Sequence, residues 1–285
     1  MQHLKIFIEL TRLNKPIGFM LLFWPCAWGL AYANNVNQNT SMFNYYLILF
    51  FFGSILMRSA GCIFNDIVDK DFDKKVKRTK KRPIPSKKIS IKKSFFYVIV
   101  LCALAFLILM QFNSLTIFLG IGSMLLAFSY PFMKRITYWP QLFLGFTFNW
   151  GIVMAWTSMN GNITQEIILL YFSAIFWTLG YDTIYGAQDM SDDEIIGLKS
   201  TSIKFKKHIL SFVSISYLIT IIMVLYLFGK SFGLNIFSLF LSMFMLSLFY
   251  QLYEFKKKQT KNYLKIFKYN NHTGLFLFLS IFLLD

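Results

Sequence analysis

The sequence is poor in charged residues, in acids above all, and in cysteine. Charged side chains make up 15% of its 285 residues, against about 25% in soluble domains. Hydrophobic residues make up 56% and the mean hydropathy is +0.53, which excludes a disordered chain and an ordinary soluble globular protein. The three cysteines fall in apolar stretches and indicate no disulfide framework, and the three histidines lie too far apart in sequence to form a metal-ligand motif.

The sequence contains several long apolar stretches with few charged residues. A membrane-spanning helix needs about 20 mostly apolar residues. Nine candidate stretches occur, the last of them short, near residues 17–33, 45–64, 95–111, 115–132, 141–157, 166–184, 210–228, 234–253 and 273–284. The sequence therefore predicts an all-α polytopic membrane protein, a bundle of nine transmembrane helices in which residues 1–285 form one integral domain.

The basic residues alternate between the predicted loops. There are 29 Lys and Arg against 13 Asp and Glu, a net charge of +16, and every cation except Arg58 and Lys230 falls in the N-terminal arm or in every second loop. Cytoplasmic loops are enriched in Lys and Arg. The pattern predicts a cytoplasmic N-terminus and a periplasmic C-terminus in a bacterial inner membrane, the bacterial source being favoured by the abundance of Lys, Asn, Ile and Phe. Since membrane topology explains the charge, no nucleic-acid partner is expected.

The first apolar stretch has an alternative interpretation. It ends in Ala31-Tyr32-Ala33, which resembles a signal-peptidase site, and cleavage there would leave eight spans. Pro25 in the middle of the stretch favours a helix that is retained.

Two short segments hold nine of the 13 acidic residues, and both lie at predicted cytoplasmic helix ends. The first holds Asp66, Asp69, Asp71 and Asp73, and the second Asp182, Asp189, Asp192, Asp193 and Glu194. At about 100° per residue, three acids of the first segment share one helix face with Asn65 beside them, whereas Asp71 points to the other side. In the second segment Asp182, Tyr185, Asp189 and Asp193 share a face.

Carboxylates that share a helix face repel one another, so a positive partner is expected. Hard divalent cations prefer oxygen ligands, and Mg²⁺ commonly joins one or two carboxylates to substrate phosphate oxygens. The two segments therefore predict Mg²⁺ ions that hold a diphosphate between them. Two solvated acidic caps are the alternative, which the recurrence of the pattern on one membrane face disfavours.

Cations near the first acidic segment are candidates for binding the diphosphate. Arg78 and Arg82 follow Asp73 closely, and a guanidinium binds phosphate oxygens bidentately. Most lysines of the run 74–93 are expected to bind anionic lipid instead. Arg58 lies inside a predicted span, where a buried arginine is either a functional residue or a helix-packing one.

At these residues the sequence resembles the aromatic-acid branch of the UbiA membrane prenyltransferase superfamily. The motif N-D-x-x-D-x-x-x-D is matched by residues 65–73, and Y-D-x-x-Y-x-x-x-D-x-x-D-D by residues 181–193. Gly186 departs from the pattern, since the family often has Ala there. Further matching segments, which extend the resemblance over about residues 10–205, are 12–18, 24–25, 76–83, 130–135 and 197–201.

The resemblance implies a nine-helix bundle around a central cavity that opens sideways to lipid. It also implies Mg²⁺-dependent transfer of a polyprenyl group from polyprenyl diphosphate to the 3-position of 4-hydroxybenzoate, an early step of ubiquinone synthesis. The catalytic residues it implies are Asp69, Asp73, Asp189 and Asp193, and the metal ligands are Asn65, Asp66, Asp69, Asp73, Asp182, Asp189 and Asp193. The diphosphate is then expected on Arg78, Arg82, Lys134 and Tyr185, and the substrate carboxylate on Arg135.

Three alternatives stay open. Within the superfamily the acceptor could be homogentisate, dihydroxynaphthoate or haem. CDP-alcohol phosphotransferases also use membrane aspartates with Mg²⁺, but the Gly-x-x-Ala-Arg stretch of their motif does not follow Asp69 or Asp73. A cation transporter would carry its acids near the membrane midplane, often at broken helices, whereas these acids lie at helix ends.

Overall fold

The computed structural model describes residues 2–76 and 79–284, and this part of the chain contains helices and no strand. The all-α prediction is thus confirmed. The long helices are α2 (Ile17–Asn37), α3 (Thr40–Val68), α5 (Ile91–Leu109), α6 (Ser114–Ile136), α7 (Pro140–Asn160), α8 (Gln165–Gly186), α11 (Ile209–Phe228), α12 (Ile236–Lys256) and α13 (Thr260–Phe282). The short ones are α1 (Gln2–Thr11), α4 (Lys70–Asp73), α9 (Met190–Ile195), α10 (Thr201–Lys204) and the 3₁₀ helix η1 (Gly229–Ser231).

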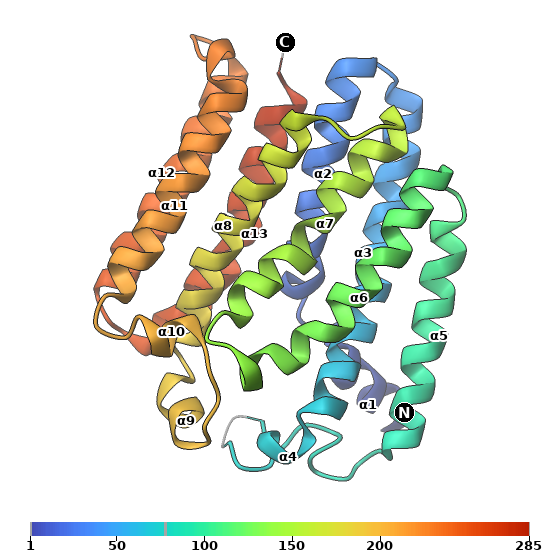
Figure 1. Cartoon of the computed structure of the whole chain (residues 1–285), viewed down its shortest axis with the longest axis vertical. Coiled ribbons are helices and arrows are strands. Elements are labelled where there is room, and N and C mark those ends of the chain that lie inside the picture. The colour runs from blue at the N-terminus through green and yellow to red at the C-terminus, as the bar shows by residue number, and fades with distance from the viewer. Residues whose placement is uncertain (1, 77–78, 285) are drawn as a thin grey trace.

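The long helices run side by side along the long axis of the molecule (Figure 1). Helices α1, α4 and α9 lie together at one end, whereas α13 finishes at the opposite end. Helix α2 packs against α3, α7 and α13, and α8 packs against α7, α11 and α13. Helix α2 therefore begins at one end of the bundle and α13 finishes at the other, as an odd number of alternating long helices requires.

Eight of these helices are long and apolar enough to cross a membrane, namely α2, α3, α5, α6, α7, α8, α11 and α12. Helix α13 has a comparable length, but Lys261, Lys265 and Lys268 make its first half polar. The predicted start of this element at residue 273 was wrong: the helix begins at Thr260. Its polar half is helical because one face is buried, at Tyr263, Ile266 and Asn270. The ninth span itself stays a prediction.

Asparagine and serine side chains mark where several of these helices begin. The Asn39, Ser90, Asn113 and Asn235 side chains each accept a hydrogen bond from a backbone N–H three residues later, at the starts of α3, α5, α6 and α12. Such caps supply partners for amides that have none within the helix. Long helices that follow one another in the chain run in opposite directions (Figure 1).

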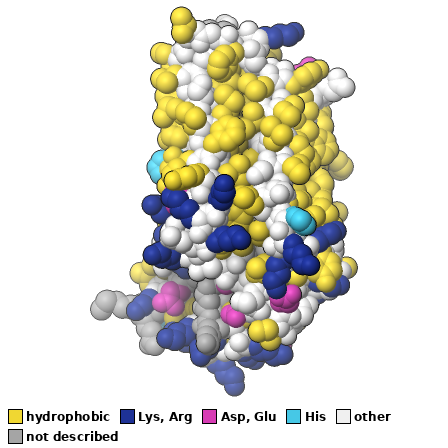
Figure 2. Space-filling model, turned by 90° about the vertical axis from the view of Figure 1, so that its left-hand side faces the viewer, with side chains coloured by type: hydrophobic (Ala, Val, Ile, Leu, Met, Phe, Trp, Pro, Cys, Tyr) yellow, Lys and Arg dark blue, Asp and Glu magenta, His cyan; other side chains and the backbone are white. Residues whose placement is uncertain are grey.

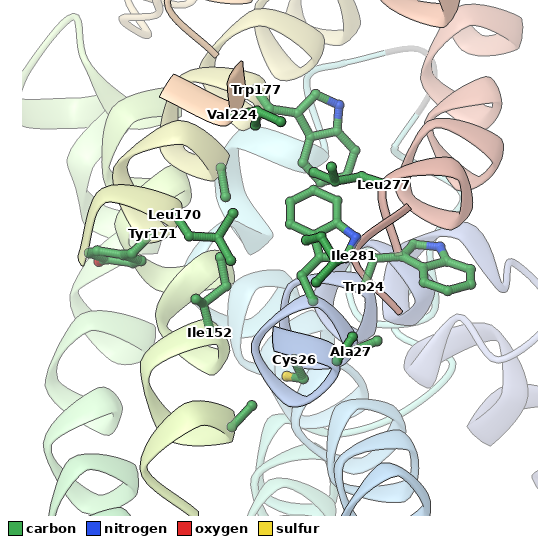
Figure 3. Close-up of a cluster of buried hydrophobic side chains, with 14 of the residues drawn as sticks. Trp24, Cys26, Ala27, Ile152, Leu170, Tyr171, Trp177, Val224, Leu277 and Ile281 are labelled. Carbon is green, nitrogen blue, oxygen red and sulfur yellow. The ribbon is translucent and has the colours of Figure 1, made fainter. Parts of the chain in front are cut away.

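Aromatic residues of α2 form the centre of the core. The Trp28 indole N–H donates to the Gly274 carbonyl at 2.8 Å, and the Trp28 and Trp177 ring centroids lie 4.9 Å apart. The Trp24 N–H donates to the Asn271 side chain at 2.9 Å. Figure 3 shows Trp177 in this cluster with Leu277 and Ile281 of α13. In lipid, close packing and hydrogen bonds between helices drive association, so these contacts hold α13 on α2.

A buried polar network ties the last three long helices to α8. Asn270 accepts from the Trp177 indole N–H at 2.9 Å and donates to Gln251 at 3.0 Å. Gln251 also accepts from the Tyr217 hydroxyl at 2.8 Å and donates to Thr273 at 3.0 Å. Each polar side chain of this network thereby has a partner, which a membrane interior favours.

We predict that Gly274→Ala destabilises the bundle. A Cβ at residue 274 would lie 2.5 Å from two atoms of the Trp24 ring, so α13 must move away from α2. Overpacking of this kind costs about 1–3 kcal/mol, which we expect as a lower midpoint of thermal unfolding in detergent. Gly53→Ala in α3 is the control, because nothing lies within 4 Å of its Cβ. Equal midpoints for the two variants would contradict the packing argument.

Candidate active site

A cavity of about 1380 Å³ lies between α2, α3, α5, α6, α7, α8 and α13. One end of it is polar and contains residues from both acidic segments. The remainder is apolar, with Phe50, Leu109, Phe112, Trp150 and Met154 among its lining residues. Such a space suits a molecule with a charged head and a long apolar tail.

The cavity reaches the outer surface of the bundle. Phe106 of α5 and Ile121 of α6 line it and are also 47% and 53% exposed. On the other side, Leu264 of α13 lines it and is 42% exposed. The surface around Phe106 and Ile121 belongs to two apolar candidate spans, so an opening there would face lipid, which is what the resemblance implies.

The first acidic segment lies at the end of α3 and in α4, where Asp66, Asp69 and Asp73 are buried. Asp66 accepts from Arg12 at 2.6 Å and from Arg82 at 3.0 Å, and Arg82 also donates to Asp73 at 2.8 Å. Asp66 is 1% exposed. Buried carboxylates of like charge require such cationic partners.

Asp69 is buried between cationic side chains of α6. Its carboxylate forms an ion pair with Lys134, and a second one with Arg135 at 3.5 Å. Burial raises the pKa of Asp69 above its ordinary value, although Lys134 lowers it. The ionised carboxylate therefore depends on positive charge nearby, and a divalent cation would supply more of it.

Asp71 behaves as the helical geometry predicted. Its side chain is 68% exposed and pairs with Lys74 at 3.0 Å. The chain turns from α3 into α4 at Asp69, so the three other acids of this segment face the interior while Asp71 faces away.

The second acidic segment reaches the same cavity from α8 and α9. Asp182, Tyr185, Asp189 and Asp193 all line it. Asp182 lies within α8, two helical turns before Asp189, and so deeper in the bundle. The Tyr185 ring lies 4.4 Å from that of Phe267 in α13. The two segments, far apart in sequence, thus meet across one space.

The predicted cationic residues occupy different places. Arg82 and Lys134 line the cavity beside the first segment. Arg78 lies outside the described residues. Arg135 lies outside the cavity lining: it donates to the Val68 carbonyl at 2.7 Å, and its guanidinium lies 4.9 Å from the Phe72 ring.

Two further arginines line the cavity. Arg58 lies 5.2 Å from the Phe148 ring, and its buried Nε has no hydrogen-bond partner among the described residues. The sequence left its role undecided. Arg12, which pairs with Asp66, was noted in the sequence only as a cation of the N-terminal arm and within a matching segment. Its location before the first span gives no local signal that it would reach an acid after the second.

The donor set at the polar end suits Mg²⁺. It consists of carboxylates with the Asn65 amide beside them, and hard cations bind such oxygens. In the described part of the chain no three His, Cys, Asp or Glu side chains converge as a metal cluster, because arginine and lysine hold the carboxylates of the first segment. These same cations could turn to phosphate oxygens when a metal ion takes the carboxylates.

Comparison with known proteins gives consistent matches. The chain is 40% identical over 282 residues to a mitochondrial 4-hydroxybenzoate polyprenyltransferase of Rattus norvegicus, covering 98% of this chain and 75% of that protein. It is 39% identical over 278 residues to a 4-hydroxybenzoate octaprenyltransferase of Vibrio campbellii, with 97% and 96% covered. Other mitochondrial relatives are longer, and the aligned part spans about 55% of their length.

A solved structure shares the fold. A UbiA homologue from Archaeoglobus fulgidus bound to GPP and Mg²⁺ superposes with a TM-score of 0.70 at 15% identity, covering 97% of this chain and 99% of that one. The sequence matches the UbiA prenyltransferase family over residues 22–280. This match accounts for the paired acidic motifs, which neither a phosphotransferase nor a transporter interpretation explains as fully. The chain belongs to the UbiA prenyltransferase family.

Proposed function

We propose that this protein transfers a polyprenyl group from polyprenyl diphosphate to the 3-position of 4-hydroxybenzoate, with Mg²⁺ as its cofactor, in ubiquinone synthesis. The observation that carries the proposal is the meeting of two acidic segments at the polar end of a long apolar cavity. Relatives with the 4-hydroxybenzoate polyprenyltransferase name over nearly the whole chain support the acceptor, and the homologue bound to GPP and Mg²⁺ supports the donor and metal.

The polar end would bind the diphosphate and its metal. Bound Mg²⁺ would neutralise the charge that develops as diphosphate leaves. The side chains that would bind diphosphate oxygens are Arg78, Arg82, Lys134 and Tyr185. The residues that would hold the metal are Asn65, Asp66, Asp69, Asp73, Asp182, Asp189 and Asp193, with Asp69, Asp73, Asp189 and Asp193 as the catalytic core.

The apolar part of the cavity would hold the prenyl group as it reacts. Cleavage of the carbon–oxygen bond leaves the pair of electrons on diphosphate and an allylic cation on the prenyl group. Aromatic faces such as those of Tyr185 and Phe267 stabilise a cation through their quadrupoles. The ring carbon beside the hydroxyl-bearing carbon of 4-hydroxybenzoate then attacks, and its proton leaves to restore aromaticity.

The active end is proposed to face the cytoplasm of a bacterial cell. Figure 2 shows Lys and Arg side chains gathered over the lower half of one face, with mainly hydrophobic side chains above. The lower end is the one that contains α1, α4 and α9 in Figure 1. The positive-inside rule supports an inner-membrane orientation with the acidic segments in the cytoplasm and α13 finishing at the periplasmic side.

The first test supplies membranes that contain the protein with 4-hydroxybenzoate and a polyprenyl diphosphate, in Mg²⁺ or in EDTA. We expect the 3-polyprenyl product in Mg²⁺ and none in EDTA, measured by chromatography and mass spectrometry. Product that resists EDTA would contradict the role of the metal. Product from homogentisate or dihydroxynaphthoate, with none from 4-hydroxybenzoate, would reassign the acceptor.

Asp69→Asn and Asp193→Asn should each lower kcat by at least about 100-fold, because each removes a charge from the proposed metal site. Asp71→Asn is the matched control, since Asp71 is exposed and pairs with Lys74 away from the cavity. Turnover is measured at saturating Mg²⁺. A kcat near that of the unaltered protein for either cavity variant would refute the metal assignment.

The substrate carboxylate needs a cation, and two arginines are candidates. We proposed Arg135 from the resemblance, and the cavity geometry adds Arg58, whose buried Nε has no described partner. Arg135→Ala and Arg58→Ala are compared by their KM values for the aromatic acid and for the diphosphate. Replacing the arginine that binds the acid should raise the KM for the aromatic acid by about tenfold or more and leave the KM for the diphosphate unchanged. Equal increases in both values would exclude that role for the residue concerned.

A further inference from the structure

Residues 197–202 connect the second acidic segment to the end of α6, whose Lys134 pairs with Asp69 of the first segment, and we call them the brace. They follow α9 and run into α10, and Leu198, Ser200, Thr201 and Ser202 are buried. In the sequence they counted only as one of the segments that match the family. In the structure they contact the backbone or side chains of α6, α7, α8 and α9.

At its first end the brace caps α6. The Lys199 backbone N–H donates to the Lys134 carbonyl at 2.8 Å, and the Lys199 ammonium donates to the Ile136 carbonyl at 3.1 Å. Carbonyls in the last turn of a helix have no intrahelical partner. The two Lys199 donors supply partners for such carbonyls at the end of α6. Lys134 is the residue whose ammonium pairs with Asp69. The brace therefore holds the backbone from which that cation projects.

On either side of Lys199 the brace binds the second acidic segment. The Leu198 N–H donates to the Asp193 carbonyl at 2.9 Å. The Ser202 hydroxyl donates to the Thr183 carbonyl at 2.8 Å, and the Thr183 and Thr201 hydroxyl oxygens lie 2.7 Å apart. Because the Thr183 hydroxyl donates its proton to Leu179, Thr201 is the donor in that pair. Two layers of hydrogen bonds thus join the brace to the end of α8.

A glutamine from α7 completes the attachment. The Gln141 side-chain oxygen accepts from the buried Thr201 N–H at 2.9 Å. Its amide nitrogen lies beside Gly186, where a Cβ would stand 3.1 Å from it and 2.8 Å from the Ser202 hydroxyl oxygen. The departure from the family pattern at residue 186 therefore has a physical reason: the absence of a methyl group lets the brace and Gln141 approach α8 directly after Tyr185.

We infer that the brace sets the separation of the two acidic segments, and that Gln141, Thr183 and Ser202 are positioning residues for the metal–diphosphate site. The inference rests on the proposed function, because it assigns these residues to the same site. The brace joins the backbone that carries the second acidic segment to the backbone that carries Lys134. Residues that orient metal ligands affect metal affinity strongly without touching the metal.

Three variants test the brace: Gly186→Ala, the double variant Gly186→Ala with Ser202→Ala, and Gly122→Ala. Gly186→Ala should raise the Mg²⁺ concentration for half-maximal turnover and the KM for prenyl diphosphate about tenfold, and leave the KM for 4-hydroxybenzoate unchanged. The double variant should show only the smaller loss expected of Ser202→Ala alone, because it removes the oxygen that the new methyl group meets. Gly122→Ala is the matched control, with nothing within 4 Å of its Cβ.

Ser202→Ala alone covers the case in which Gly186→Ala fails to fold. It creates no clash and removes one hydrogen bond to the Thr183 carbonyl, so a rise of about fivefold in the Mg²⁺ requirement is expected. An unchanged Mg²⁺ requirement in both single variants would overturn the inference. The inference would also be overturned if Gly186→Ala raised the Mg²⁺ requirement, the KM for prenyl diphosphate and the KM for 4-hydroxybenzoate equally, and the double variant did not reduce these increases.

A binding measurement separates this inference from the proposed reaction. The purified protein is tested for Mg²⁺-dependent retention of labelled geranyl diphosphate, which requires no turnover. If the unaltered protein retains the diphosphate but makes no prenylated product, the proposed reaction fails while the brace is still tested through binding. Weaker Mg²⁺-dependent retention in Ser202→Ala supports the brace, and equal retention overturns it.

Discussion

The burial of several carboxylates close together is the constraint on which the rest of this structure depends. A carboxylate removed from water is costly unless a cation or hydrogen-bond donor accompanies it. The bundle supplies those partners from distant parts of the chain: Arg12 before the first span, Arg82 after the second and Lys134 at the end of the fourth. The ends of these helices must therefore converge, and their convergence places the polar end of the cavity beside its apolar part.

Much of the fold could be predicted because its signals are local. Eight apolar runs became helices close to their expected limits, since hydrocarbon thickness and backbone hydrogen bonding leave few other structures. Helix α13 was misjudged because its polar first half is stabilised by contacts with other helices, such as the Asn270 hydrogen bonds, which hydropathy does not register.

The candidate site could be predicted where its residues belong to a pattern. The helical spacing separated Asp71 from its neighbours, and the structure agrees. Contacts between distant segments left no such signal. Arg12 reaches an acid 54 residues later, Phe267 stacks on Tyr185 from the last helix, and Gly186 seemed merely a departure from the family. Each of these contacts depends on how the helices approach one another. The periodicity of a single sequence does not reveal that approach.

The order of these partners along the chain has a consequence for synthesis in the membrane. Arg12 and Arg82 flank the first two long helices, so the counter-charges of Asp66 and Asp73 are present once that hairpin has been inserted. Asp69 must wait for Lys134, two helices later, and the cavity wall is incomplete until α13 has been translated. A nascent chain therefore neutralises the acids of its first segment progressively, and the cavity closes only after α13 has been made.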